Sequence, residues 1–385
     1  FVQYINEYIS IQGTLSFLNS PQNYSLLTGV QTNLYKCFLP KAWEIGNNTG
    51  VSAFVHPDGV FDDSNGGRLR REIYKRFVYH FHFINEKLLF TEVGHPEVFS
   101  LNVYANAGCD MLTMIGNLFD PKTIDQCFDD NNEYPLMGIK DDKGNWNIFG
   151  NKDRIIKIGV VERAVFSRLY DDSNNANEAR LPIIHAKQLV DVLQKMSLQK
   201  SLMSISNEFY TTQCFDETGA QDKKVITVNP SFVQDGLGFV YNGPHIGVAN
   251  PVFQTARAEV KTKGDFDRVD ITIIPDNYLQ RTKYNRAIDK DSYIKEIPST
   301  SWGINYAKTY KLLSRKMLNL KQERTLISAI APPNTAHINS IFGITFKDLR
   351  KMSLMSAYME SVPYDYFIKS MGKTNLLDNN AAQLP

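Results

Sequence analysis

The chain has 385 residues, 43% of them apolar and 22% charged, and these proportions exclude a disordered or fibrous protein. Its length favours two or three domains over a single compact core. The 42 Lys and Arg residues nearly balance the 41 Asp and Glu residues, so only local clusters of charge can indicate a nucleic-acid partner.

The cysteines and the absence of apolar runs restrict the compartment. The four cysteines lie far apart and form no CxxC pair, which argues against structural zinc and favours a reducing environment. No apolar run approaches the ~20 residues of a membrane span, and no signal peptide opens the chain. Because the sequence starts at Phe1 as if within a domain, we expect a piece of a larger cytoplasmic protein.

The first third of the chain predicts alternating helices and strands. Residues 4–20 and 31–45 have helical spacing, and Pro40 is expected to kink or break the second helix. A strand at 51–56, a helix with a basic outer face at 69–77, and strands at 79–85 and 98–104 follow. This order predicts half of an α/β sheet, without the Gly-rich turn that usually opens a doubly wound sheet.

The remaining two thirds predict a different organisation. Residues 116–160 are rich in turns, 155–161 predict a strand, 171–178 a polar linker and 182–207 one long amphipathic helix. After residue 209 the pattern predicts short strands at 224–228, 238–241 and 269–274, and then helices at 306–319 and 348–361.

Two histidines are the only candidates for a metal site. His80 and His82 stand two residues apart on one face of a predicted strand, but no Cys or carboxylate is spaced to complete the site, so we favour a structural role. No GxSxG, HExxH or P-loop motif occurs. The residues alone therefore predict no self-contained active site and no metal.

Positive charge is concentrated between residues 281 and 325. This stretch contains eleven Lys and Arg residues and four Asp and Glu residues, which gives a net charge of +7, and aromatic and amide residues lie between them in the sequence. Such residues contact phosphates and base edges in DNA, although a solvated helical face balanced by acidic loops fits equally well.

Three groups of segments, taken in order, resemble the large DNA adenine-N6 methyltransferases of restriction–modification and phage-defence systems, in which methylase and target-recognition domains are fused (the type IIG-like arrangement). QTNLYKCFLPKAW and VSAFVHPDGVF resemble the helix and strand that follow the catalytic Asn-Pro-Pro-aromatic motif. GRLRREIYKRF and EVGHPEVFSLNVY resemble the far edge of the methylase sheet. GPHIGVAN, DNYLQRTKY, ERTLISAIAPP and SVPYDYF resemble the target-recognition region.

The resemblance implies an α/β fold in three parts. Residues 1–115 would form the distal half of a Rossmann-like methyltransferase sheet, 116–207 a connecting region with a long helix, and 208–385 a mixed α+β target-recognition domain. Both the S-adenosylmethionine loop and the Asn-Pro-Pro motif are absent. We therefore expect a prokaryotic parent protein that binds S-adenosylmethionine in an N-terminal methylase half, with or without a nuclease domain. This portion by itself is expected to bind no S-adenosylmethionine and to be inactive.

The resemblance also implies roles for particular residues. A methylase extrudes its adenine from the duplex, and in related enzymes the loop before the last sheet strand contacts the second face of that base. This implies His95, or else Phe90. Double-stranded DNA would be held by basic side chains: Arg68, Arg70, Arg71, Arg281, Lys283, Arg315, Lys316 and Arg324. The alternatives are solvated faces for these residues, and a stand-alone DNA-binding specificity module or a protein-interaction domain for the whole chain.

Overall fold

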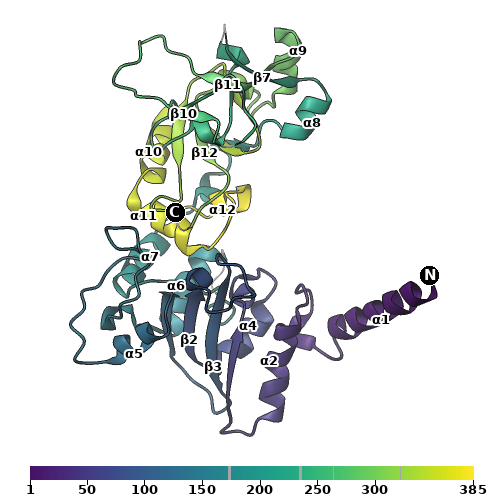
Figure 1. Cartoon of the computed structure of the whole chain (residues 1–385), viewed down its shortest axis with the longest axis vertical. Coiled ribbons are helices and arrows are strands. Elements are labelled where there is room, and N and C mark those ends of the chain that lie inside the picture. The colour runs from purple at the N-terminus through teal and green to yellow at the C-terminus, as the bar shows by residue number, and fades with distance from the viewer. Residues whose placement is uncertain (172–174, 234–235, 263, 321) are drawn as a thin grey trace. The chain divides into compact units, whose positions relative to one another are not determined.

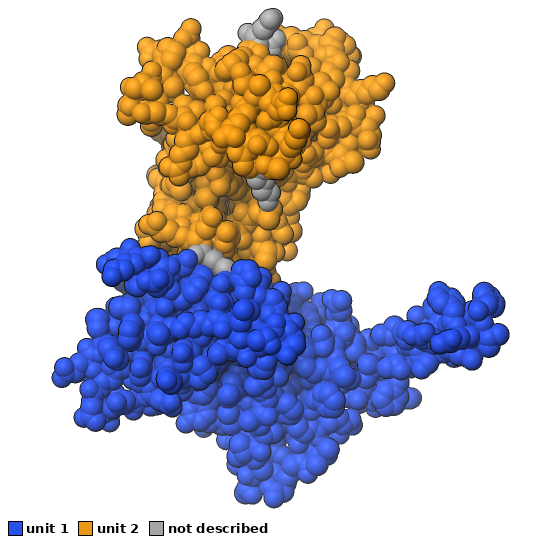
Figure 2. Space-filling model, viewed as in Figure 1, with its two compact units in different colours: residues 1–199 blue, residues 200–385 orange. Residues whose placement is uncertain are grey.

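The computed structural model describes residues 1–171, 175–233, 236–262, 264–320 and 322–385 (Figure 1). The chain forms two compact units, 1–199 and 200–385, coloured separately in Figure 2. The division lies within the predicted connecting region, 116–207. Of the predicted linker 171–178, residues 172–174 lie outside the described residues, and Glu178 closes a turn by donating its backbone N–H to Asn175 O.

Unit 1 is built on a five-stranded sheet with the strand order β1-β3-β2-β4-β5. The strands are β1 (Val51–His56), β2 (Phe77–Ile84), β3 (Val98–Ala105), β4 (Leu112–Leu118) and β5 (Ile156–Ile158). β3 is antiparallel to both β1 and β2, β2 is parallel to β4, and β4 is antiparallel to β5. The carboxyl ends of β1, β2 and β4 therefore share one edge of the sheet, which we call the carboxyl edge.

The helices of unit 1 precede, separate and follow these strands. They are α1 (Val2–Asn19), α2 (Leu34–Ile45), α3 (Gly59–Asp62), α4 (Gly67–Tyr74), α5 (Lys122–Phe128), α6 (Val160–Tyr170) and α7 (Gln188–Ser197), with 3-10 turns at Ser25–Leu27, Asn85–Lys87 and Lys152–Arg154. α2 runs unbroken past Pro40, and α1 buries none of its residues. None of the helices in the described residues combines the length and hydropathy needed to cross a bilayer.

The two faces of the sheet differ in chemistry because the side chains of β2 alternate. Phe81 and Phe83 pack with Ile115, Leu118 and Cys127 in an apolar cluster. His80 and His82 point to the other face and are also buried, so this alternation separates two buried faces rather than a buried face from an exposed one.

Two expectations for unit 1 are corrected. The single long helix at 182–207 is wrong: α7 covers only Gln188–Ser197, and a short 3-10 turn follows at Leu202–Ile205. Leu202 does not continue the helix, since its backbone N–H donates to the carbonyl of Leu384. The strand expected at 155–161 is only Ile156–Ile158, since Val160 already begins α6.

Unit 2 is a mixed α+β structure with several small sheets. An antiparallel sheet has the order β13-β12-β15-β6 and contains β6 (Phe209–Thr212), β12 (Lys311–Arg315), β13 (Ser328–Ala331) and β15 (Ile341–Phe346). Three pairs accompany it: β7 (Ile226–Phe232) with β11 (Arg281–Arg286), β9 (Gln254–Ala256) with β10 (Phe266–Arg268), and β8 (Val240–Tyr241) with β14 (Ala336–His337). The helices are α8 (Glu217–Asp222), α9 (Lys290–Glu296), α10 (Leu349–Met359), α11 (Val362–Ser370) and α12 (Asp378–Ala382), with 3-10 turns at Gly236–Gly238, Gly243–His245 and Tyr306–Lys308.

Two predicted elements of unit 2 are wrong. Residues 269–274 form a turn, in which the Asp270 carboxylate accepts the backbone N–H and the hydroxyl of Thr272. The helix expected at 306–319 is a 3-10 turn followed by β12. β12 lies between β13 and β15, so neighbouring residues such as Leu312 and Leu313 are both buried and no alternation marks the strand.

Candidate functional site

The loop between β2 and β3 carries the two residues predicted to face an extruded base. The buried Asn85 side chain orders this loop by donating to the carbonyls of Phe90 (2.8 Å) and Val93 (2.9 Å) and by accepting the N–H of Phe90 (3.1 Å). The Phe90 ring packs edge-on against Phe99, with 4.9 Å between ring centroids. The His95 side chain is 69% exposed, and its Nδ1 lies 3.2 Å from the Glu86 carboxylate. The structure thus brings His95 and Phe90 together in one ordered loop at the carboxyl edge.

A buried polar cluster lies beside this loop at the same edge. Asp58 follows β1, and its carboxylate accepts the hydroxyl of Ser100 at the start of β3. The Oδ2 of Asp58 lies 3.6 Å from His82 Nε2 and 3.9 Å from His80 Nε2, and Oδ2 and His80 Nε2 have no hydrogen-bond partner among the described residues. Burial raises the pKa of Asp58 and lowers the pKa of each of the two histidines to about 4.

The hydrogen bonds of the cluster identify its tautomers. His80 Nδ1 lies 2.7 Å from Asn102 Oδ1, which can only accept, so His80 carries its proton on Nδ1. Asn102 Nδ2 lies 3.0 Å from His56 Nε2, which therefore accepts. His82 Nδ1 accepts the backbone N–H of Asn117 (3.3 Å), so neutral His82 holds its proton on Nε2, the atom that points to Asp58.

This arrangement disfavours a metal ion, because a protonated Nε2 on His82 cannot act as a ligand. Within the described part of the chain, no group of three or more His, Cys, Asp or Glu residues is arranged to hold a metal ion. The sequence analysis found the two histidines but missed Asp58, Ser100 and Asn102. The alternation Ser-Leu-Asn in β3, facing His-Phe-His in β2, is the signal that would have found two of them.

The three predicted arginines of α4 differ in environment. Arg68 is exposed and, among the described residues, has no ion-pair partner; it lines a cavity of about 500 Å³ with Thr28, Ser64 and Asn65. Arg71 pairs with the Glu178 carboxylate. Arg70 is 2% exposed and donates to the carbonyls of Val60, Asp63 and Glu178. The expectation that Arg70 lies on the basic outer face is therefore corrected: its guanidinium is bound inside unit 1.

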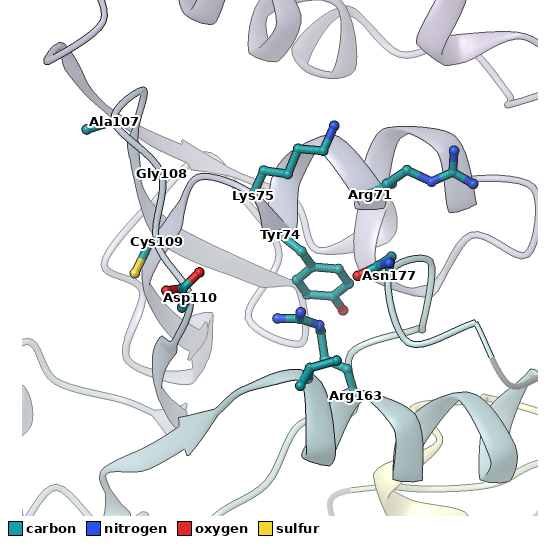
Figure 3. A pocket seen from close by; sticks show the side chains of 10 residues that line it. Arg71, Tyr74, Lys75, Ala107, Gly108, Cys109, Asp110, Arg163 and Asn177 are labelled. Atoms are coloured by element: carbon teal, nitrogen blue, oxygen red, sulfur yellow. The ribbon is translucent and has the colours of Figure 1, made fainter.

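A second cavity of about 640 Å³ lies between α4, the β3–β4 loop and the start of α6. Figure 3 shows the Arg163 side chain against the Tyr74 ring, with Asp110 on one side and Asn177 on the other. Lys75 and Arg71 also line this cavity. It is located at the edge of the sheet opposite the carboxyl edge, because β2 and β4 begin there and β3 ends there.

In unit 2, two of the predicted DNA contacts lie on β11. The guanidinium of Arg281 packs over the Phe232 ring at 4.7 Å. The ammonium of Lys283 lies 4.7 Å from the Tyr284 ring and 3.6 Å from the Glu217 carboxylate. The two side chains are half-buried and stand two residues apart, and the ladder between β11 and β7 shifts its register at Lys283.

The other three predicted contacts of unit 2 are engaged in internal hydrogen bonds. Arg315 Nε donates to Ile246 O (2.9 Å), and burial lowers the pKa of Arg315. Lys316 Nζ donates to the Gln213 side chain (2.8 Å). Arg324 donates to Glu360 O (2.8 Å) and lies 3.6 Å from the Asp365 carboxylate. Lys321, from the same basic stretch, lies outside the described residues.

Among the described residues of this stretch, Lys311 is the basic side chain that is completely buried. Its ammonium donates to the carbonyls of Thr309 (2.8 Å) and Ala307 (3.3 Å) and lies 5.1 Å from the Tyr306 ring centroid. No carboxylate pairs with it among the described residues, and burial lowers the pKa of Lys311 to about 7. Lys311 therefore belongs to the interior of unit 2 rather than to a DNA-facing surface.

Comparisons with known proteins give matches among solved structures alone: no protein-family model and no curated protein matches the chain. The chain is similar to the type IIG restriction endonuclease BpuSI, with 8% identity and a TM-score of 0.34, over 94% of this chain and 43% of that one. It is also similar to the type IIL restriction-modification enzyme MmeI in complex with DNA, with 11% identity and a TM-score of 0.36, over 88% of this chain and 40% of that one. The chain thus spans about two fifths of the length of two restriction-modification enzymes that it resembles at low identity.

Proposed function

We propose that the chain is the distal sheet and target-recognition portion of a DNA adenine-N6 methyltransferase of a restriction–modification or phage-defence system. The observation that carries this proposal is the order of elements in unit 1. The segments that resemble the methylase form helix α2, strand β1, helix α4 and the β2–β3 hairpin. These elements follow one another in the order that the resemblance predicts. The mixed α+β character of unit 2 is compatible with a target-recognition domain.

The open edge of the sheet supports a missing partner for unit 1. β1 pairs with β3 on one side only, and its Val51 and Val55 side chains are exposed. Leu34, Phe38 and Ile45 of α2 are exposed as well. An unpaired strand with apolar side chains is normally covered by another element. We propose that the half holding S-adenosylmethionine covers it, either in the same polypeptide or as a separate subunit.

The carboxyl edge is the proposed location of the extruded adenine, since ligands of open α/β sheets bind outside the carboxyl ends of parallel strands. His95 is the proposed contact to the second face of the base, because its ring is exposed and, among the described residues, pairs with Glu86. Phe90 is the second candidate, but its ring is already packed against Phe99. The donor half would supply the remaining groups of this pocket.

The geometry also ranks the proposed DNA contacts. Arg68 and Arg281 have no ion-pair partner among the described residues, so an approaching phosphate would not have to displace a carboxylate. Lys283 and Arg71 would first have to release Glu217 and Glu178. Arg315, Lys316 and Arg324 would exchange internal hydrogen bonds for external ones, and Arg70 is not proposed as a contact.

The DNA part of the proposal is tested by measuring duplex affinity as a function of salt concentration with the whole 385-residue chain. We expect the logarithm of the association constant to fall with log salt by roughly 0.9 per phosphate contact. Arg68→Gln and Arg281→Gln should each make this slope shallower by about one, whereas Lys143→Gln, in an exposed loop of unit 1, should leave it unchanged. Absence of salt-dependent duplex binding would refute DNA recognition by this chain.

The methylase part is tested in the full-length protein by transfer of a labelled methyl group to duplex DNA. We expect N6-methyladenine as the product. His95→Ala should lower kcat while the KM for S-adenosylmethionine stays unchanged, because His95 is proposed to touch the base and not the donor. Duplex binding without methyl transfer in the full-length protein would instead favour the stand-alone specificity module.

A further inference from the structure

The cavity between α4, the β3–β4 loop and α6 is constructed from three converging segments. Leu112 pairs with Ile158, which places the β3–β4 loop beside Gly159 and the first residue of α6. The backbone N–H of Cys109 donates to Lys75 O (3.0 Å) and ties this loop to the end of α4. Gly108 reverses the loop with a φ of +93°, a conformation that residues with a Cβ rarely adopt. The walls of the cavity are therefore held by backbone hydrogen bonds.

One wall of the cavity is formed by a buried arginine that has no ion-pair partner among the described residues, although Glu162 and Asp110 contribute negative charge to its surroundings. Arg163 is only 8% exposed, and its Nε has no hydrogen-bond partner among the described residues. Its guanidinium packs over the Tyr74 ring at 4.8 Å, and it makes no ion pair with any described carboxylate. Burial lowers the pKa of Arg163. A buried guanidinium without a partner is costly, and an anion bound in the cavity would offset that cost.

The amino end of α6 opens into the same cavity. α6 has eleven residues and begins at Val160, which lines the cavity. Its N-cap is Gly159, which has no side chain to accept the first N–H groups of the helix, while the Glu162 carboxylate in the first turn accepts the N–H of Gly159 itself (2.7 Å). The amino end of a helix carries free N–H donors and partial positive charge, both of which favour an anion. Arg163 and the helix end thus favour the same kind of ligand.

The other charges around the cavity are partly neutralised. Arg71 pairs with Glu178, and Lys75 pairs with Glu72 at 2.6 Å. Asp110 is the carboxylate that lines the cavity, and its side chain is exposed. Three cations against one carboxylate leave the lining at +2, and Arg163 is the cation among them that lacks an ion-pair partner.

We propose that this cavity is a phosphate site in which Arg163, the α6 amino end and Lys75 bind one phosphate group. A guanidinium donates two parallel hydrogen bonds to phosphate oxygens, and helix N–H groups donate to the remaining oxygens. The phosphate group could belong to free phosphate or to a phosphodiester of the DNA backbone, since both offer the same oxygens. The site lies on the opposite edge of the sheet from His95, so it does not depend on the proposed function.

The test compares wild type, Arg163→Gln and Lys75→Gln in the whole chain, with inorganic phosphate in calorimetry and duplex DNA in anisotropy. Arg168→Gln is the matched control, because Arg168 is an exposed arginine near the other end of α6. Loss of a charge-assisted hydrogen bond should weaken phosphate binding roughly tenfold to a hundredfold in Arg163→Gln. The loss in Lys75→Gln should be smaller, because Lys75 is exposed and paired. Lys75→Gln also serves if Arg163→Gln fails to fold.

Each outcome has a defined meaning. Weaker phosphate binding with unchanged duplex affinity supports a site for free phosphate. Weaker duplex affinity with a shallower salt slope supports a backbone phosphodiester, whether or not free phosphate binds. Unchanged binding of both probes in Arg163→Gln and Lys75→Gln, or absence of phosphate binding by wild type together with unchanged duplex affinity, would overturn the proposal. If only Arg68→Gln and Arg281→Gln weaken duplex binding, the result bears on the proposed function and not on this site.

Discussion

Lys311 gives unit 2 a dependence of stability on pH that can be tested directly. The pKa of Lys311 is about 7 in the folded chain, against about 10.4 for an exposed lysine. Between these values the unfolded chain binds the proton and the folded chain does not, so the free energy of unfolding rises with pH. Integrating this difference from pH 7 to 8.5 gives an increase of about 1.6 kcal/mol.

We choose the range from pH 7 to 8.5 because a second buried group lowers the free energy of unfolding as the pH rises above this range. Burial raises the pKa of the Cys214 thiol to about 12, so its contribution falls as the pH rises beyond the ordinary thiol pKa near 9. His337 is buried in the same interior of unit 2 and stays neutral in this range, because burial lowers its pKa to about 3. The measured slope between pH 7 and 8.5 therefore reports mainly on Lys311.

The assay is native-state hydrogen exchange, followed by mass spectrometry of peptides that contain β12 and corrected for intrinsic rates. Lys311→Met removes the titrating group at similar volume and should flatten the slope, whereas Lys308→Met, at an exposed position nearby, should preserve it. If Lys311→Met keeps the same slope as the wild type, the lysine is charged in the folded chain and the reasoning is wrong.

Three further predictions follow from buried groups and from the missing motifs. The free energy of unfolding of unit 1 should decrease between pH 6.5 and 4 in urea titrations, because the pKa values of His80 and His82 are lowered to about 4; Asp58 opposes this trend with its raised pKa, so Asp58→Asn should steepen the decrease. Gly343→Ala would place a methyl group 2.1 Å from the Tyr306 hydroxyl oxygen, and it should destabilise unit 2 by about 1–3 kcal/mol in thermal unfolding. Calorimetry should detect no binding of S-adenosylmethionine to this chain, and micromolar binding would contradict the proposal that the donor site lies in another segment.

The local signals of the sequence were sufficient for much of unit 1. Strand β1 spans Val51–His56 as predicted, because an apolar run ends at Pro57, which cannot continue a ladder. Helix α4 and the strands of the β2–β3 hairpin were also predicted within a few residues. The helix expected at 306–319 failed because β12 is buried on both faces, and its apolar run carries no period that separates strand from helix.

The candidate sites were harder to predict, because they depend on contacts between distant segments. Arg70 and Arg68 share a basic helix in the sequence, but only the structure shows that Arg70 is enclosed by three carbonyls. Arg163 carried no motif at all: its significance comes from Tyr74 and from a loop that lies more than fifty positions away. Burial without a partner is a property of the folded chain and leaves no pattern in the sequence.

The polar layer between β1, β2 and β3 also limits how these strands can misalign during folding. His80 faces Asn102 and His82 faces Ser100 across the ladder, while Phe81 and Phe83 occupy the apolar side. Sliding β2 by one position would exchange its histidines and phenylalanines between the two faces of the sheet. The imidazoles would then enter the apolar cluster, and the phenyl rings would lie against a carboxylate. Incorrect pairings of these strands would therefore be penalised on both faces at once, which favours a single alignment even though β1 is an edge strand.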